Sequence, residues 1–217
     1  MELEQTASMR RLPVYLLLDC SASMAGEPIS AMEMGLRGLI GELRSDPQAL
    51  DTVWVSVIAF SSAAELVAPL TDLAEIDVPD LDASGTTALG EAVQLLSERI
   101  HDEVRQTTRD QKGDWKPMVF VFTDGEPTDD WEDPVDDFRA SGLAVVVACG
   151  AGPEVDDVIL KRLGHHAIRL HDTQPGTLAA FMQWVTVSVT ERSHSVGSGS
   201  KKVEELPPPP QGVMLVP

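Results

Sequence analysis

The 217-residue sequence has few cysteines, few basic residues and no long apolar segment. Its two cysteines, Cys20 and Cys149, are too few for the disulfide framework of a small secreted domain. No run reaches the roughly 18 apolar residues that a membrane-spanning helix needs. Residues 1–11 lack the apolar core of a secretory signal and do not resemble a transit peptide. These absences predict a protein of the reducing cytoplasm, with no membrane partner.

Acidic residues outnumber basic ones, with 35 Asp and Glu against 16 Lys and Arg, and the net charge is −19. A surface of this sign opposes contact with phosphate backbones and anionic lipids. Nucleic acid is therefore not expected as a ligand, whereas cations and basic protein surfaces suit the charge. Most of the individual acidic side chains need no role beyond keeping the surface solvated.

Apolar segments alternate with segments of helical periodicity from residue 12 to about 191, which predicts a doubly wound α/β fold. The short connection 61–63 allows no crossover, so the strands that it joins should form an antiparallel hairpin at one edge. Right-handed crossovers then give a mostly parallel six-stranded sheet, of order 3-2-1-4-5-6, with one antiparallel edge strand. Strands are expected at 12–18, 52–60, 64–70, 117–123, 143–148 and 167–170, and helices at about 28–44, 88–106, 132–141, 156–163 and 175–191.

The sequence predicts three parts: an N-terminal extension at 1–10, one folded domain at 11–192 and a flexible tail at 193–217. The tail is first rich in Gly and Ser, as flexible linkers are, and then has a proline run at 207–210 typical of a polyproline-like segment. The last residues, 212–217, are apolar, so they either fray or dock on another surface such as a neighbouring chain.

Side chains with oxygen atoms follow two of the predicted strands, 12–18 and 117–123, and another precedes the helix at 88–106. They are Asp19, Ser21, Ser23, Thr87 and Asp124. Ligands gather at the carboxyl ends of parallel strands where the strand order reverses, so this set should meet on one rim of the sheet. Such oxygens suit hard divalent cations. Any one of these residues could instead cap a helix, but together they predict one metal site.

The pattern Asp19-x-Ser21-x-Ser23, followed by Thr87 and then by Asp124 before a glycine, resembles the metal-ion-dependent adhesion site of von Willebrand factor A (VWA) domains. The resemblance covers about residues 11–192. It implies that the hydroxyls of Ser21, Ser23 and Thr87 coordinate the cation. It also implies that the two carboxylates act largely through bound water or hydrogen bonds.

Thr86 competes with Thr87 for the threonine of this pattern. Thr87 is preferred because the family pattern places the threonine two residues before an apolar position, here Leu89. Mg²⁺ is the cation expected first, with Mn²⁺ and Ca²⁺ as alternatives. Mg²⁺ favours six oxygens, and a set of mainly neutral hydroxyls leaves it electrophilic with one position open. A Glu or Asp carboxylate of a partner protein can fill that position.

The resemblance therefore implies a metal-dependent protein-interaction module and no enzyme activity. The compact single-domain layout and the segment Thr-Asp-Gly-Glu-Pro-Thr-Asp at 123–129 are similar to the bacterial TerY group, which is associated with tellurite resistance. That likeness implies a stress-response system in which a protein kinase and a metal-dependent phosphatase are the partners.

Two other classes of function remain as alternatives. The first is a metal-dependent hydrolase or phosphatase that uses the same cation to activate water. The sequence lacks a P-loop and a Gly-x-Ser-x-Gly elbow, and Ser21 stands where a haloacid dehalogenase-type phosphotransferase needs a second acid. The second is a metal-independent adaptor for an AAA-type ATPase.

Four further features have both a functional and a structural explanation. The acidic residues between 124 and 137 are a second cation site or a partner-selecting rim, or else a solvated loop with acids at a helix start. The pair His165-His166 binds a metal or lies at a helix end. Cys20 is a reactive thiol or a small buried residue, and Trp131 is an exposed contact or a packing residue. The structural explanation is favoured in each case.

Overall fold

The structure is a computed structural model, and it describes residues 10–197, 206–210 and 213–216. Seven strands form one mixed sheet in the order β3-β2-β1-β4-β5-β6-β7. The strands are β1 (Leu12–Asp19), β2 (Val53–Phe60), β3 (Ala64–Asp72), β4 (Met118–Thr123), β5 (Val145–Ala151), β6 (His166–Leu170) and β7 (Val213–Leu215). The helices are α1 (Glu27–Ser45), α2 (Pro47–Thr52), α3 (Leu89–Glu103), α4 (Glu132–Ser141), α5 (Asp157–Leu163) and α6 (Pro175–Gly197).

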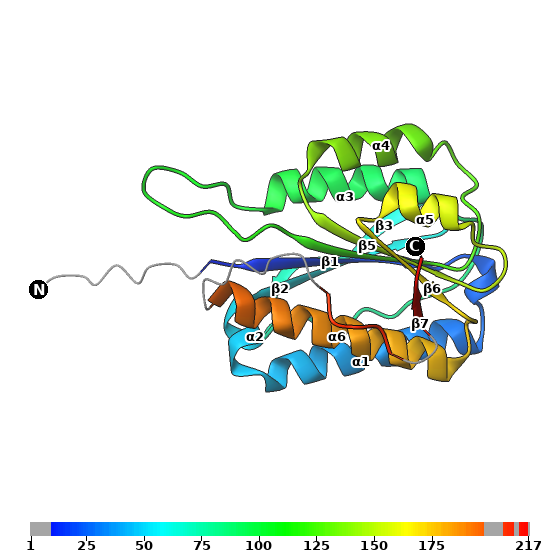
Figure 1. Ribbon diagram of the computed structural model, residues 1–217, viewed down its shortest axis with the longest axis horizontal. Coiled ribbons are helices and arrows are strands. Elements are labelled where there is room, and N and C mark those ends of the chain that lie inside the picture. The colour runs from blue at the N-terminus through cyan, green and yellow to red at the C-terminus, as the bar shows by residue number, and fades with distance from the viewer. Residues whose placement is uncertain (1–9, 198–205, 211–212, 217) are drawn as a thin grey trace, which may run out of the picture.

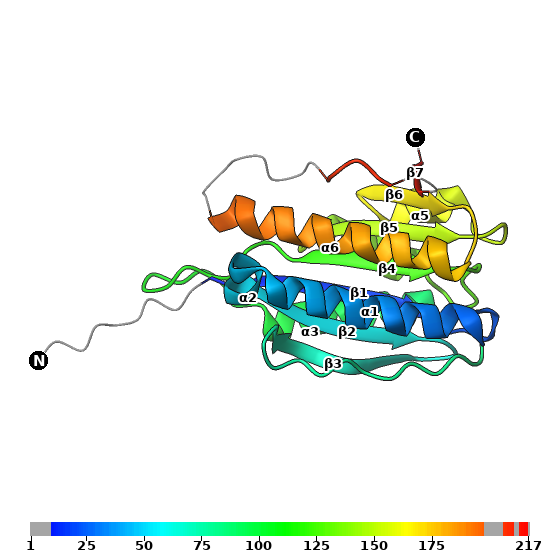
Figure 2. The same ribbon diagram turned by 90° about the horizontal axis from the view of Figure 1, so that it is seen from below.

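Helices cover both faces of the sheet, with α1, α2 and α6 on one side and α3, α4 and α5 on the other (Figures 1 and 2). Every residue of β1 is buried, because its side chains alternate between two apolar cores. Leu16 and Leu18 lie in the core shared with α1 and α6, whereas Tyr15 and Leu17 lie in the core shared with α3 and α4. A near-continuous apolar strand is what a parallel sheet covered on both faces requires.

The predicted order of the first six strands and the antiparallel β2–β3 edge are confirmed. The sheet has one strand more than the sequence predicted. Residues Val213–Leu215 pair antiparallel with β6, so both edges of the sheet are antiparallel. The apolar end of the chain supplies backbone groups to the edge of β6, which would otherwise have an unpaired row of them. Val213 is buried, and the backbone N–H of Val216 donates to the carbonyl of Ala167 at 2.9 Å.

The helix predicted at 175–191 continues to Gly197, so the prediction of a flexible segment from residue 193 was wrong for its first turn. Ser193 and Val196 fall on the buried face of α6, and the Ser193 hydroxyl lies 2.9 Å from that of Thr52 in α2. The Gly- and Ser-rich composition of the segment from residue 193 gave no sign of this contact, because within its described part, 193–197, Ser193 and Val196 are the residues that face the core. In the part of the chain that the structure describes, no helix is long and apolar enough to cross a membrane.

The short helix α2 was not expected, although its start has a clear sequence signal. The Asp46 carboxylate accepts a hydrogen bond from the backbone N–H of Ala49 at 2.8 Å, and Pro47 occupies the first turn. An Asp followed by Pro is a favoured start for a helix because it satisfies a free N–H and presets the backbone. The helix turns the chain directly from α1 into β2.

Candidate metal centre

The candidate centre lies on the rim formed by the carboxyl ends of β1 and β4. These strands are parallel neighbours in register, with Leu18 opposite Phe122. Asp19 ends β1 and Asp124 follows the last residue of β4, so the register brings the two carboxylates to one edge. The chain leaves β1 toward the face covered by α1 and leaves β4 toward the face covered by α4 (Figure 1), as expected where the strand order reverses.

The Asp19 side chain is fully buried, and two hydrogen bonds fix its orientation. Its Oδ1 accepts from the backbone N–H of Ser21 at 2.8 Å, and its Oδ2 accepts from the Thr123 hydroxyl at 2.6 Å. Both carboxylate oxygens are thus held by groups at the rim. The sequence analysis did not assign this role to Thr123, although its place as the last residue of β4, beside the end of β1, is the signal for it.

Three further side chains form a chain of hydrogen bonds at the opening of the rim. The Ser23 hydroxyl donates to Oδ1 of Asp124 at 2.7 Å and lies 3.0 Å from the Ser21 hydroxyl. Ser21 and Asp124 are buried, whereas Ser23 is exposed. These contacts bring residues about a hundred positions apart within reach of one small ligand, with one side open to solvent.

Thr87 and not Thr86 lies inside this arrangement. Thr87 is buried, and its hydroxyl is 3.7 Å from the place where a Cβ on Gly125 would stand. Its backbone is tied to Thr128, since the Thr87 carbonyl accepts from the Thr128 N–H at 2.9 Å. Thr86 is exposed, and its hydroxyl contacts Ser62 on the other side of the loop at 3.3 Å. The structure thus places all five predicted residues on one rim.

Backbone hydrogen bonds lock the rim loops together. The N–H of Ala22 donates to the carbonyl of Gly85 at 3.1 Å, and the N–H of Ser84 donates to the carbonyl of Cys20 at 2.8 Å. Gly85 has a φ of 74°, and a Cβ there would stand 2.2 Å from the Ser62 hydroxyl oxygen, so only glycine fits this turn. The hydroxyls are therefore held in place before any ligand arrives.

The donor set has the chemistry of a hard-cation site. The loops at 20–26, 81–88 and 124–131 contain five acidic residues and no Lys or Arg. Within the described residues, no three His, Cys, Asp or Glu side chains gather in a way that could hold a metal, so a cation here would depend on the hydroxyls. Hydroxyl and carboxylate oxygens fit Mg²⁺, Mn²⁺ or Ca²⁺ better than soft metals.

Burial raises the pKa of Asp19 and of Asp124 above the ordinary value of 3.8, although hydrogen bonds from Ser21, Thr123 and Ser23 oppose the rise. A bound cation favours the ionised carboxylates, so protons and cation compete. We expect Mg²⁺ affinity to fall as the pH is lowered, starting above the pH at which ordinary carboxylates protonate. Titration calorimetry at stepped pH measures this, and an affinity that stays constant down to pH 4 would contradict it.

One acidic residue of the 124–137 segment has a structural role that the sequence analysis did not find. The carboxylate of Asp129 accepts from the backbone N–H groups of Gly90 and Glu91 at 3.1 and 3.0 Å, and so caps α3 from a distant loop. A Cβ on Gly90 would stand 2.6 Å from the Asp130 carbonyl oxygen, which shows how closely the loop approaches. Glu132 and Asp133 lie in the first turn of α4, as acids at a helix start do.

The other candidates of the sequence have structural surroundings. His165 Nδ1 accepts from the backbone N–H of Val146 at 3.1 Å, so this histidine joins the start of β6 to β5. Cys20 is buried, and burial raises the pKa of its thiol to about 12, which keeps it protonated and unreactive at neutral pH. Trp131 is half-buried against the core, with the Arg162 guanidinium 5.2 Å from its ring. All three have the surroundings of structural residues.

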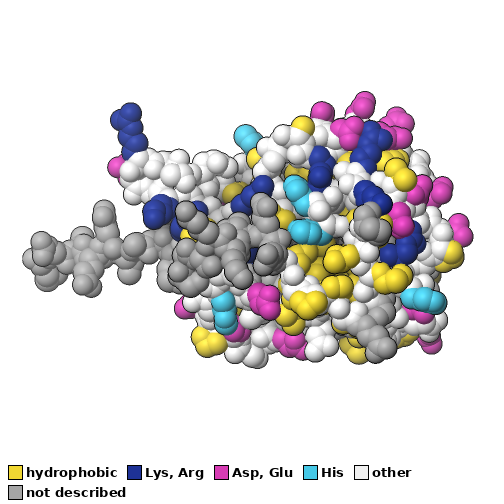
Figure 3. Space-filling model, in the orientation of Figure 1, with side chains coloured by type: hydrophobic (Ala, Val, Ile, Leu, Met, Phe, Trp, Pro, Cys, Tyr) yellow, Lys and Arg dark blue, Asp and Glu magenta, His cyan; other side chains and the backbone are white. Residues whose placement is uncertain are grey.

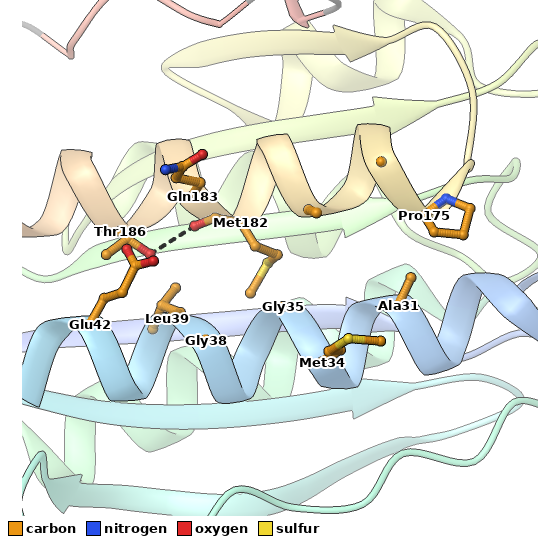
Figure 4. A pocket seen from close by; sticks show the side chains of 12 residues that line it. Ala31, Met34, Gly35, Gly38, Leu39, Glu42, Pro175, Met182, Gln183 and Thr186 are labelled. Atoms are coloured by element: carbon orange, nitrogen blue, oxygen red, sulfur yellow. Dashed lines mark hydrogen bonds between the residues drawn. The ribbon is translucent and has the colours of Figure 1, made fainter.

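A groove of about 530 Å³ lies between α1 and α6, away from the rim (Figure 4). Small residues such as Gly35 and Gly38 open it, and the buried Met182 side chain of α6 lies against Gly35 of α1. Glu42 is its one acidic lining residue, so no group of titratable side chains converges there. The chemistry-bearing residues are therefore those of the rim.

The doubly wound sheet agrees with a comparison to protein families. The family model for the von Willebrand factor type A domain matches residues 14–177. The chain therefore belongs to the von Willebrand factor type A domain family. A search of curated proteins gave no match.

Solved structures share the fold at low sequence identity. Proximal thread matrix protein 1 from the mussel byssus is 16% identical with a TM-score of 0.62, and the match covers 83% of this chain and 48% of that one. A von Willebrand factor type A protein from Catenulispora acidiphila is 16% identical with a TM-score of 0.61, covering 83% and 43%. The ArnB paralog VWA2 from Sulfolobus acidocaldarius is 17% identical with a TM-score of 0.55, covering 86% and 46%.

The chain thus spans less than half the length of these three proteins, and the likeness shows the fold alone. One structure of the mussel protein, 16% identical with a TM-score of 0.60, is described as having a zinc-occupied MIDAS motif, the metal-ion-dependent adhesion site. A protein of this fold is therefore known with a cation in its MIDAS motif.

Proposed function

We propose that this domain is a protein-interaction module that holds a divalent cation at the rim and receives a Glu or Asp of a partner protein there. The observation that carries the proposal is the hydrogen-bonded series Asp124–Ser23–Ser21, beside Asp19 and Thr87. The cation would supply a Lewis-acidic centre for a carboxylate ligand, and Mg²⁺ is the first choice, with Mn²⁺ and Ca²⁺ as alternatives.

Each residue of the set has a distinct part in this proposal. Ser21, Ser23 and Thr87 offer hydroxyl oxygens to the cation, and the exposed position of Ser23 leaves the partner a path to the rim. Asp19, held at both oxygens, orients the loop that carries the two serines. Asp124 balances the cation charge, and the other acids of the rim repel acidic groups that do not reach the cation.

The finer proposal concerns the biological setting. The segment at 123–129 and the compact domain support a TerY-like role in a bacterial, cytoplasmic stress response, including tellurite resistance. A protein kinase and a metal-dependent phosphatase would then be the partners, and the domain itself would not be an enzyme. A basic surface on either partner, beside an exposed Glu or Asp, would match the acidic rim.

Affinity purification tests this proposal with Ser23→Ala as the matched variant. Ser23 is exposed, so the substitution removes one hydroxyl without emptying a core. We expect partners to be retained by the wild-type domain in Mg²⁺ or Mn²⁺ and released by EDTA. Retention by Ser23→Ala should be lower by about tenfold or more, since even residues that only orient metal ligands typically contribute this much and Ser23 offers a ligand oxygen itself. Retention that persists in EDTA would instead favour a metal-independent adaptor. Turnover of a generic phosphate ester, lost in Ser23→Ala, would favour the hydrolase.

A further inference from the structure

The loop between α3 and β4, residues 104–117, projects from the end of the molecule opposite the candidate metal centre (Figure 1). This segment, called the arm below, joins the carboxyl end of α3 to the amino end of β4. The rim lies at the carboxyl ends of β1 and β4, so the length of the sheet separates the two features. Residues 105–112 of the arm are all exposed.

Hydrogen bonds give the arm a defined shape with a tight tip. The backbone N–H of Thr108 donates to the carbonyl of Gln111 at 2.9 Å, which leaves Arg109 and Asp110 as the two residues of the tip. Near the body of the domain, the N–H of Asp114 donates to the carbonyl of Arg105 at 2.9 Å and joins the two sides of the arm at its base. An ordered loop loses less conformational entropy on binding than a flexible one.

The charge of the arm is opposite to that of the chain as a whole. It contains four basic residues, Arg105, Arg109, Lys112 and Lys116, and two acidic ones, in a chain of net charge −19. Figure 3 shows dark-blue Lys and Arg side chains on the projecting part. One of the two acids, Asp114, is buried at the base, so Asp110 is the one exposed carboxylate of the arm. Asp110 makes no hydrogen bond or ion pair with any other described residue.

The rim has the properties that this tip requires. Its loops contain Asp82, Asp124, Glu126, Asp129 and Asp130 and have no basic residue to compete with the arm. A carboxylate is the ligand that the rim would receive under the proposed function. The acidic rim attracts the basic side chains on either side of Asp110, which offsets its repulsion of the Asp110 carboxylate. A Glu or Asp on an acidic surface would have no such compensation and would be repelled.

We propose that Asp110 of one copy of this chain is received at the candidate metal centre of a second copy, so that copies associate head to tail. This inference rests on the proposed function. Because arm and rim lie at opposite ends, a pair joined in this way still has one free rim at one end and one free arm at the other. Such a heterologous contact closes into a ring or continues as an open chain. The negative net charge of the copies opposes their approach. Salt screens this repulsion beyond about 8–10 Å at physiological ionic strength, so the charges next to the contact, those of the arm and the rim, decide whether the copies associate.

Sedimentation velocity of the full chain, at stepped concentrations in Mg²⁺ or in EDTA, tests the inference. We expect the mass to rise with concentration in Mg²⁺ and to stay at 23.4 kDa in EDTA. The Asp110→Asn variant should weaken association by about tenfold or more, because it removes the charged ligand of a metal contact. Asp51→Asn is the control, since Asp51 is exposed at the end of α2, at the same end of the molecule.

A mixture of two variants gives a sharper result. Asp110→Asn retains the rim but lacks the arm ligand, whereas Asp19→Asn retains the arm ligand but loses the rim. Each variant alone should associate in Mg²⁺ about tenfold or more weakly than the wild type. An equal mixture should form pairs with nearly the wild-type affinity and nothing larger, since each pair has no further working end.

Calorimetry with Mg²⁺ separates the two proposals. If the wild-type chain binds Mg²⁺ and stays a monomer at all concentrations, the head-to-tail inference is overturned and the proposed function stands. If it binds no divalent cation, both fall. Association that is equal for Asp110→Asn and the wild-type chain would assign the contact to another surface and overturn the inference.

Discussion

In the Asp19→Asn variant we expect Mg²⁺ affinity to fall by about 10–100-fold, while the metal-free domain unfolds at no lower temperature than the wild type. Burial raises the pKa of Asp19, so the folded state keeps a proton that the unfolded state has already lost. The stability of the metal-free wild type therefore falls as the pH rises from the ordinary pKa of Asp in the unfolded state through the raised pKa of Asp19 in the folded state. Asn has no proton to lose at this position, so the variant avoids this loss of stability.

The local geometry supports a folded variant. The Asn Oδ1 keeps the bond from the Ser21 N–H, which is 2.8 Å long with Asp19. The amide NH₂ would face the Thr123 hydroxyl, which can accept from it and donate to the Gly125 carbonyl, 3.3 Å away. The variant thus changes the charge of the rim and little of its packing.

Thermal unfolding with and without Mg²⁺, together with calorimetry, measures both parts of this prediction. Cation at a hundred times its dissociation constant stabilises the folded state by about 2.7 kcal/mol, so the wild type should melt at a higher temperature in Mg²⁺. Asp82→Asn is the matched control because it removes the same charge from an exposed position on the same rim. Equal losses of affinity in both variants would mean that the general field of the rim, and not the Asp19 position, attracts the cation.

Most of the fold could be predicted from the sequence because its buried strands are continuous apolar runs. Segments such as 118–122 have no polar residue, and a sheet covered by helices on both faces is the arrangement that buries them. The seventh strand could not be predicted in this way. A three-residue strand has no periodicity of its own, and Val213 is placed only by the edge of β6 that it joins.

The rim could be predicted as far as topology determines it. Asp19 ends β1 and Asp124 follows β4, and the predicted strand order makes these parallel strands neighbours, so their carboxyl ends bring the two residues together. The contacts that fix their side chains depend on the paths of the loops, which no pattern in the sequence encodes. The capping of α3 by Asp129 is one such contact, because its partners lie 38 and 39 positions earlier in the chain.

The Asp114→Ala variant should lose about 3–5 kcal/mol of folding free energy, since it leaves a buried guanidinium without its partner. The side chains of Arg11 and Asp114 are 9% and 1% exposed, and Arg11 Nε lies 3.0 Å from Oδ1 of Asp114. The same carboxylate also accepts from the backbone N–H of Arg105 at 2.8 Å. Its removal therefore leaves several donors unsatisfied.

Urea unfolding followed by circular dichroism measures this loss. Asp102→Ala is the control, because Asp102 pairs with Arg99 at the surface with side chains 56% and 29% exposed, and such a pair contributes at most about 1 kcal/mol. The double variant Arg11→Met with Asp114→Ala should lose less than the sum of the single losses, since no unpaired guanidinium remains. Additive losses would show that the two side chains do not act as a pair.

The same variant separates the shape of the arm from its charge. Asp114 ties the base of the arm to Arg11, which directly precedes β1, whereas Asp110 at the tip makes no hydrogen bond or ion pair with another described residue. Asp114→Ala should therefore weaken head-to-tail association although Asp110 is intact, because a loosened arm loses more entropy when it binds. Asp110→Asn should weaken association with no change in folding free energy. If Asp114→Ala destabilises the domain and leaves association unchanged, the ordered shape of the arm has no part in the contact.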